Sequence, residues 1–82
     1  MTRFKKLKEK IEEKEVRSDV TFKELSKYLN HYGFYLVKTK GSHHKFENEF
    51  KESIIIPVHS SYIKQAYVKE AVKIVKENDD EQ

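Results

Sequence analysis

The chain has no cysteine and no tryptophan among its 82 residues, and only one proline and two glycines. Without cysteine it offers neither a disulfide framework nor a cysteine-based metal site. No apolar run approaches the length that spans a bilayer, and the N-terminus lacks the apolar core of a signal peptide. We therefore expect a cytoplasmic protein with no membrane partner.

Basic side chains outnumber acidic ones, and they are unevenly distributed. The formal net charge is +3, and charged residues make up 38% of the chain. The last six residues hold four acids and no base, so the rest carries 17 basic against 10 acidic side chains. This density favours a polyanionic partner such as nucleic acid, although in a small domain it also serves solubility. A chain of this length buries one modest core, which predicts a single domain.

Two amphipathic helices are predicted to frame this domain. Thr21 and Glu24 form a capping box at the start of the first helix, and Gly33 is placed to end it in a left-handed conformation. The second helix is expected over residues 60–77, capped by either serine of the pair at its start, with Ile63 on its apolar face.

Three short segments between the helices have the composition of β-strands. They cover residues 34–40, 43–48 and 53–58. Gly41 and Ser42 make the first turn, a polar connection joins the second and third strands, and Pro57 closes the third. The order predicts an α+β fold in which a three-stranded antiparallel sheet carries two helices on one face.

An N-terminal extension over residues 1–18 precedes the domain. Phe4, Leu7 and Ile11 follow helical spacing and form one narrow apolar stripe. We interpret this segment as an extension outside the core. It could dock on the domain or a partner, belong to a frayed helix, or join two copies of the chain. The expected division is then 1–18, a domain over 19–77 and an acidic tail over 78–82.

The candidate site lies in the second strand, directly after the turn. Strand alternation puts His43 and Lys45 on one face, and His44 and Phe46 on the other. Phe46 is strongly apolar, so its face should meet the helices. This leaves His43 and Lys45 on the open face and His44 at the core edge. Adjacent histidines on opposite faces are poorly placed to chelate one ion, so we expect no metal and no cofactor.

An imidazole beside an ammonium suits attack on an RNA phosphodiester. Neutral His43 can take the proton from the ribose 2′-hydroxyl, while Lys45, with Lys38 or Lys40, stabilises the charge that builds on the phosphoryl oxygens. His59 follows the third strand and could act as an acid, contact phosphate or merely end the strand. The same residues also suit an inert surface turn, because a histidine near a turn is more often inert than catalytic.

These motifs together resemble a known family. Gly-Ser-His-His-Lys-Phe at residues 41–46, followed by Ile-Pro-Val-His at 56–59 before an amphipathic helix, is similar to the HicA toxins (YcfA-like mRNA interferases). The resemblance spans about residues 21–75. It implies a double-stranded-RNA-binding-domain-like α-β-β-β-α fold, metal-independent endoribonuclease cleavage of mRNA, translation arrest and neutralisation by a HicB-type antitoxin. The long N-terminal extension and the acidic tail depart from the family pattern.

The resemblance also assigns roles to residues. The family's catalytic histidine corresponds to His43, although in some members it stands one place later, at His44. Gly41 carries over as the turn glycine. Two other functions stay open on the residues themselves: a module that binds structured RNA without cleaving it, and a protein-interaction domain.

Overall fold

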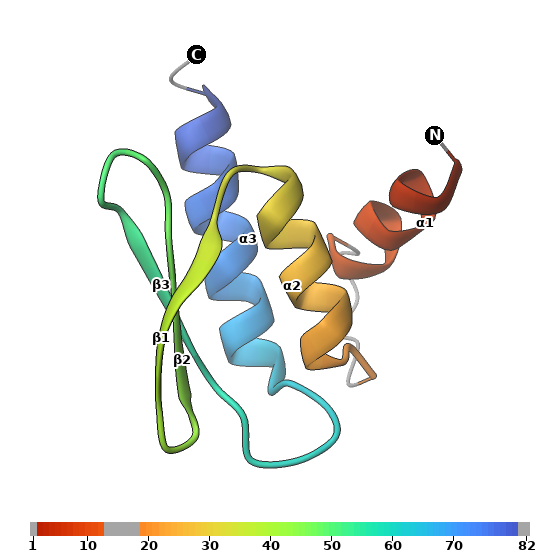
Figure 1. The fold of residues 1–82 in the computed structure, drawn as a ribbon. Helices are drawn as coiled ribbons and strands as arrows, with labels where there is room; N and C mark the ends of the chain where they lie inside the picture. The colour runs from red at the N-terminus through yellow and green to blue at the C-terminus, as the bar shows by residue number, and fades with distance from the viewer. Residues whose placement is uncertain (1, 13–18, 81–82) are drawn as a thin grey trace.

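The computed structural model describes residues 2–12 and 19–80. Its elements, in order, are α1 (Thr2–Ile11), α2 (Phe22–His31), β1 (Tyr35–Lys40), β2 (His43–Glu47), β3 (Ser53–Pro57) and α3 (Gln65–Asp80). The predicted α+β class and the order helix, three strands, helix are confirmed. One face of the sheet is covered by α2 and α3, while α1 lies on the far side of α2 (Figure 1). Within the described ranges, no helix has the length and apolar character needed to cross a membrane.

The sheet is antiparallel with β2 in the middle, in the order β1-β2-β3. Leu36 pairs with Phe46, and the register then shifts by one residue before Lys38 pairs with Lys45. All six residues of β1, which is an edge strand, are exposed. A bulge and lysines on an edge strand hinder pairing with another sheet.

The core lies between the sheet and the helices α2 and α3. Phe46, Ile54 and Ile56 enter it from β2 and β3. The helices contribute Leu25, Tyr28, Leu29, Val68, Ala71 and Val75. In β2 the residues beside Phe46 are not buried, as the predicted alternation requires. In β3, which lies at an edge of the sheet, Ile55 is exposed between the buried Ile54 and Ile56. One face of the sheet is therefore packed and the other is free.

Both predicted ends of α2 are confirmed. The Thr21 hydroxyl accepts a hydrogen bond from the Glu24 N–H at 3.1 Å, and the Glu24 carboxylate accepts one from the Thr21 N–H at 3.0 Å. At the other end Gly33 has φ 88°, and the Phe34 N–H donates to the Leu29 carbonyl at 2.9 Å. This closure turns the chain sharply from α2 into β1.

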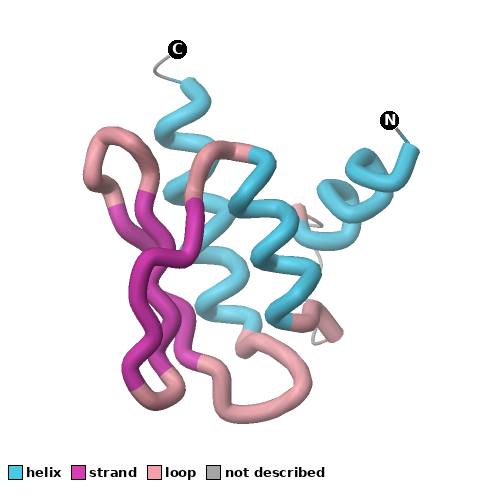
Figure 2. The backbone as a smooth tube through the Cα atoms, viewed as in Figure 1, coloured by secondary structure: helices cyan, strands magenta, loops and turns pink. Residues whose placement is uncertain are grey.

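The last helix begins later than the sequence predicts. It starts at Gln65, not at residues 60–61, and continues to Asp80, through the first residues of the expected acidic tail. Ile63 is buried as expected, but it lies in the loop before the helix, where its N–H donates to the Val20 carbonyl at 2.8 Å. Figure 2 shows this long loop between β3 and α3. The Ile63 N–H is therefore used in a hydrogen bond to a distant part of the chain. The helix that we predicted to begin at Ser60 or Ser61 does not form there.

The N-terminal helix packs more closely against the domain than we expected of an extension outside the core. Ile11 is 5% exposed and belongs to the core cluster, and the Phe4 ring stacks on His31 with ring centroids 3.6 Å apart. The interpretation that this stripe lies outside the core is wrong for Ile11. Because the stripe faces α2, less apolar surface remains for joining two copies. Residues 13–18 of the predicted extension fall outside the described ranges.

A part-buried ion pair ties α1 to α2. The Lys10 ammonium donates to both oxygens of the Glu24 carboxylate, at 2.9 and 3.0 Å. Burial alone would raise the pKa of Glu24, but the hydrogen bond from the Thr21 N–H and the nearby Lys10 charge outweigh it and hold this pKa below its usual 4.5. The capping box therefore also serves as the attachment point of α1.

Substitution of Gly33 is expected to destabilise the fold through its backbone alone. A Cβ at this position meets no atom within 4 Å, but φ is 88°. Gly33→Ala should lower the free energy of unfolding by about 1 kcal/mol, because other L-residues adopt left-handed conformations at a cost. Gly33→Asn should lose less, since asparagine tolerates this region. Equal losses in urea unfolding would contradict the explanation.

Acid should weaken the fold through Glu24. Its pKa is lower in the folded than in the unfolded chain, so ionised Glu24 stabilises the fold above the usual pKa of 4.5. That contribution is lost as the pH falls below this value towards the folded-state pKa. Urea unfolding at about pH 6 and about pH 3.5 should show a smaller pH-dependent loss in Glu24→Gln than in the unsubstituted chain. Parallel losses in both proteins would contradict this account.

Candidate functional site

The site is organised by the two-residue turn between β1 and β2. Gly41 has φ 59° and is followed by Ser42, an arrangement that matches a type II′ hairpin turn. The Ser42 carbonyl accepts a hydrogen bond from the Val58 N–H at 2.8 Å, and it lies 3.0 Å from Nδ1 of His44. One carbonyl oxygen therefore joins the turn, β2 and the chain that leaves β3.

The two histidines face different surroundings, as the alternation predicts. His43 is exposed on the open face of the sheet, where it pairs with Lys40 and Pro57. His44 is half-buried on the helix side, with its ring 4.5 Å from that of Phe22. The Ser42 carbonyl can only accept, so the His44 contact is a hydrogen bond when Nδ1 carries the proton. Nε2 of His44 is then the unprotonated nitrogen.

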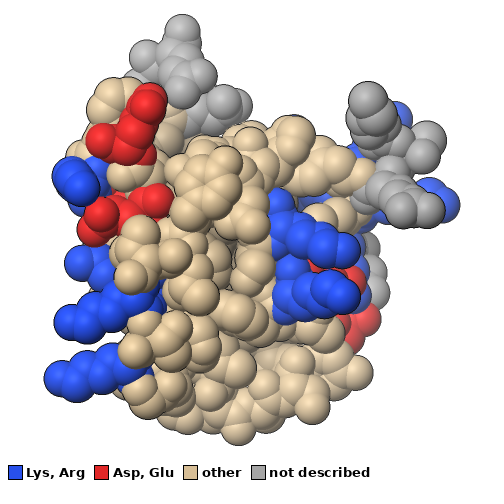
Figure 3. Space-filling model, in the orientation of Figure 1, with Lys and Arg blue, Asp and Glu red and all other residues tan. Residues whose placement is uncertain are grey.

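Cationic side chains surround His43 in the sheet register. Lys40 is its cross-strand partner, and Lys38 pairs with Lys45 beside it. Figure 3 shows lysine atoms along the sheet side of the molecule, with acidic atoms gathered above them. Lys45 also forms an ion pair with Glu47 on the same face, at 3.5 Å between Nζ and Oε2. That pair offsets part of the positive charge on this face.

His59 lies near this end of the sheet. The chain around His59 lies close to His43, because β2 and β3 are neighbours and His43 pairs with Pro57. His59 stands two residues beyond Pro57 and is exposed. Within the residues that the structure describes, the imidazoles of His43 and His59 make no hydrogen bond, ion pair or ring contact. Both imidazoles are therefore accessible to a ligand from solvent.

Helices α2 and α3 add to the positive character of the turn end, although Glu24 offsets part of it at α2. They run in the same direction, so the N-termini of α2 and α3 lie towards the end of the molecule that holds Gly41 and Ser42 (Figure 1). Helix N-termini carry partial positive charge and favour anions. The chemistry that fits this end is proton transfer by an accessible imidazole next to a bound polyanion.

Two features of the site could not be read from spacing. Phe22 supports the His44 ring, although it lies 22 residues earlier in the chain. Ser42 contacts His44 through its backbone carbonyl, and not through its side-chain hydroxyl. The only available signal for Phe22 was its place directly after the helix cap. No cluster of three or more metal-ligating side chains occurs within residues 2–12 and 19–80.

Comparison with known proteins gives one match. The family model described as HicA toxin of bacterial toxin-antitoxin matches residues 22–76, which include α2, the whole sheet and most of α3. Comparison with curated proteins and with solved structures gave no significant match. The matched region contains every candidate site residue, whereas α1 lies outside it.

The His44 geometry predicts a fixed tautomer. In the neutral imidazole, at about pH 8, long-range ¹H–¹⁵N spectra should show His44 protonated at Nδ1. Phe22→Ala should loosen the ring and mix the two tautomers, whereas Phe50→Ala, which removes an exposed ring near the opposite end of β2, should leave the His44 signals unchanged. Protonation at Nε2 in the unsubstituted chain would contradict the assignment.

Proposed function

Because the chain belongs to the HicA toxin family of bacterial toxin–antitoxin systems, which implies a cognate antitoxin, we propose that it is an endoribonuclease that cleaves mRNA in the cytoplasm and arrests translation. One observation carries the proposal beyond family membership. An exposed imidazole, His43, lies on the free face of the sheet among cross-strand lysines, so a phosphodiester can reach it.

In the proposed reaction, neutral His43 takes the proton from a ribose 2′-hydroxyl. The 2′-oxygen attacks the adjacent phosphorus, so an O2′–P bond forms as the P–O5′ bond breaks. The 5′-oxygen leaves with a proton from water or from His59, and the other fragment ends in a 2′,3′-cyclic phosphate. The nucleophile belongs to the substrate, so the step needs no metal ion.

The lysines are assigned to the phosphate. Lys40 is the cross-strand neighbour of His43, which supports a direct role in binding the scissile group. Lys38 lies next to it on the exposed edge strand and suits a flanking phosphate. Lys45 is partly neutralised by Glu47, so we assign it a smaller share of the binding energy than Lys40.

His44 is the rival base, and its case rests on orientation. A general base is often held in one tautomer by a third group, and the Ser42 carbonyl is placed to do this for His44. Its half-buried position beside Phe22 limits contact with RNA, whereas His43 is open to solvent. We therefore assign the base to His43 and give His44 the role of positioning the turn.

The assignment predicts that His43→Ala abolishes toxicity without unfolding the protein. Cleavage of RNA should fall at least about a hundredfold, the usual contribution of a general base. The measurement is growth after induced expression, together with the yield of 2′,3′-cyclic phosphate ends from purified protein and labelled RNA. Because His43 is exposed, the thermal unfolding of the His43→Ala protein should match that of the unsubstituted chain.

His44→Ala and His59→Ala are the matched variants. If His44→Ala alone removes cleavage, the base is His44 and the assignment to His43 is wrong. A protein that binds the RNA but yields no cyclic phosphate would support the non-catalytic RNA-binding alternative. A protein with no measurable RNA affinity would favour the protein-interaction domain.

A further inference from the structure

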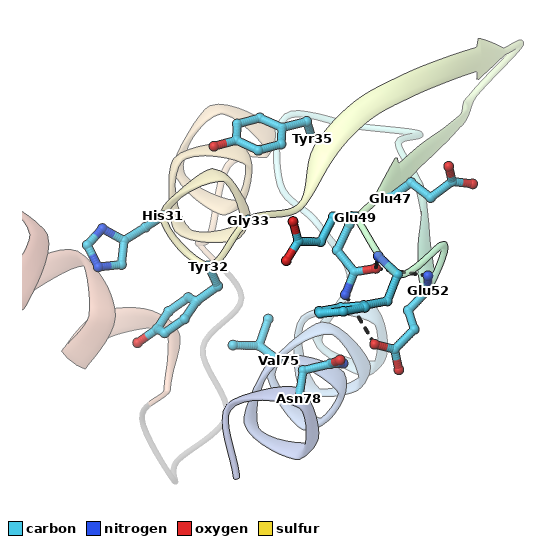
Figure 4. Close-up of a pocket in the computed structure, with 11 residues that line it drawn as sticks. His31, Tyr32, Gly33, Tyr35, Glu47, Glu49, Glu52, Val75 and Asn78 are labelled. Carbon is cyan, nitrogen blue, oxygen red and sulfur yellow. Dashed lines mark hydrogen bonds between the residues drawn. The ribbon is translucent and has the colours of Figure 1, made fainter. Parts of the chain in front are cut away.

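An aromatic groove lies at the end of the molecule opposite the Gly41–Ser42 turn. It has a volume of about 1140 Å³ and is formed by the end of α2, the start of β1, the connection between β2 and β3, and the last turns of α3. Tyr32, Tyr35 and Phe50 supply its rings, and Val75 and Asn78 lie on its α3 side (Figure 4). Phe50 is 68% exposed and Tyr35 57%, although aromatic rings are costly to leave in water.

The rim of this groove is negative. Figure 4 shows the Glu49 carboxylate extending towards the end of α2, with Glu52 on the other side of the connection. Glu47 turns away from the groove and pairs with Lys45 and Lys51. No lysine or arginine is among the described residues that line the groove.

The helices reinforce this polarity. The C-termini of α2 and α3 lie at this end of the molecule, and helix C-termini carry partial negative charge (Figure 1). The last turn of α3 contains no basic residue that would offset it. A chain with net charge +3 therefore presents a negative, aromatic hollow. Such a surface repels phosphate, which disfavours RNA as its ligand.

We propose that this groove binds an arginine-bearing, extended segment of a partner protein. A guanidinium group stacks on aromatic faces and donates paired hydrogen bonds to a carboxylate, so Tyr35, Phe50 and Glu49 suit it. The groove exceeds the usual range for small-molecule pockets and is open, so it accommodates several residues of a peptide. The proposal does not depend on ribonuclease activity, because the groove and His43 lie at opposite ends of the molecule.

The test is titration of the full ¹⁵N-labelled chain with a synthetic peptide. The probe is an acetylated and amidated pentapeptide, Gly-Arg-Leu-Arg-Gly, compared with the same peptide carrying neutral citrulline in place of arginine. We expect the arginine peptide to shift amides at residues 31–35 and 48–52. The citrulline peptide should bind at least about tenfold more weakly, because charge-assisted hydrogen bonds to the carboxylates are lost.

Three variants sharpen the result. Glu49→Gln combined with Glu52→Gln, and separately Phe50→Ala, should each weaken peptide binding by about tenfold. Both Glu49 and Glu52 are exposed, as is Phe50, so the melting temperature should change little. Glu9→Gln combined with Glu70→Gln removes two exposed carboxylates outside the groove and should leave binding unchanged.

Several outcomes would overturn the proposal. Shifts centred on residues 40–45, or spread over the surface, would place the peptide elsewhere. Equal binding of the citrulline peptide would remove the role of charge. If spermidine shifts the same amides with the same affinity, the groove is a general cation site and not a peptide site. Cleavage of RNA, measured in parallel, should persist in the Glu49 and Glu52 variants, so that a failure of the ribonuclease proposal is seen separately.

Discussion

Burial of Phe46 is the contact on which the arrangement of the sheet depends. Side chains alternate along a strand, so a shift of one residue in β2 would move Phe46 into solvent and turn His43 towards the helices. Phe46 is 1% exposed and packs near Phe22 and the isoleucines of β3. The turn at Gly41 and Ser42 then sets where β2 begins. The exposed position of His43 therefore follows from the burial of Phe46 on the opposite face of β2.

Local signals predicted much of the fold. The capping box at Thr21, the left-handed Gly33 and the three strands rest on neighbours within a few residues, and each was recovered with small differences at its ends. The start of α3 was not predicted, because the Ile63 N–H binds the carbonyl of Val20, which is distant in sequence. The burial of Ile11 was missed for a related reason. A narrow stripe does not say which surface it covers, and here that surface is α2.

The candidate site likewise has a part that local signals predicted and a part that they did not. Strand alternation was enough to separate His43 from His44, since it needs only the position of one large apolar residue. The support of His44 by Phe22 and the pairing of Lys45 with Glu47 depend on distances that spacing does not supply. The groove beside Phe50 combines residues from four elements, so no single motif announced it. In the sequence, Phe50 is only one apolar residue within a polar connection.

The parallel course of α2 and α3 has a consequence for the proposed ribonuclease function, because it bears on how the molecule would approach RNA. With both N-termini near the turn and acidic side chains near the opposite end, the molecule is an electric dipole as well as a net cation. In the field of a polyanion such a particle rotates before contact, so that its turn end leads. Encounters would then begin with His43 already facing the phosphates, and the rate of productive collision would fall as salt shortens the range of that field.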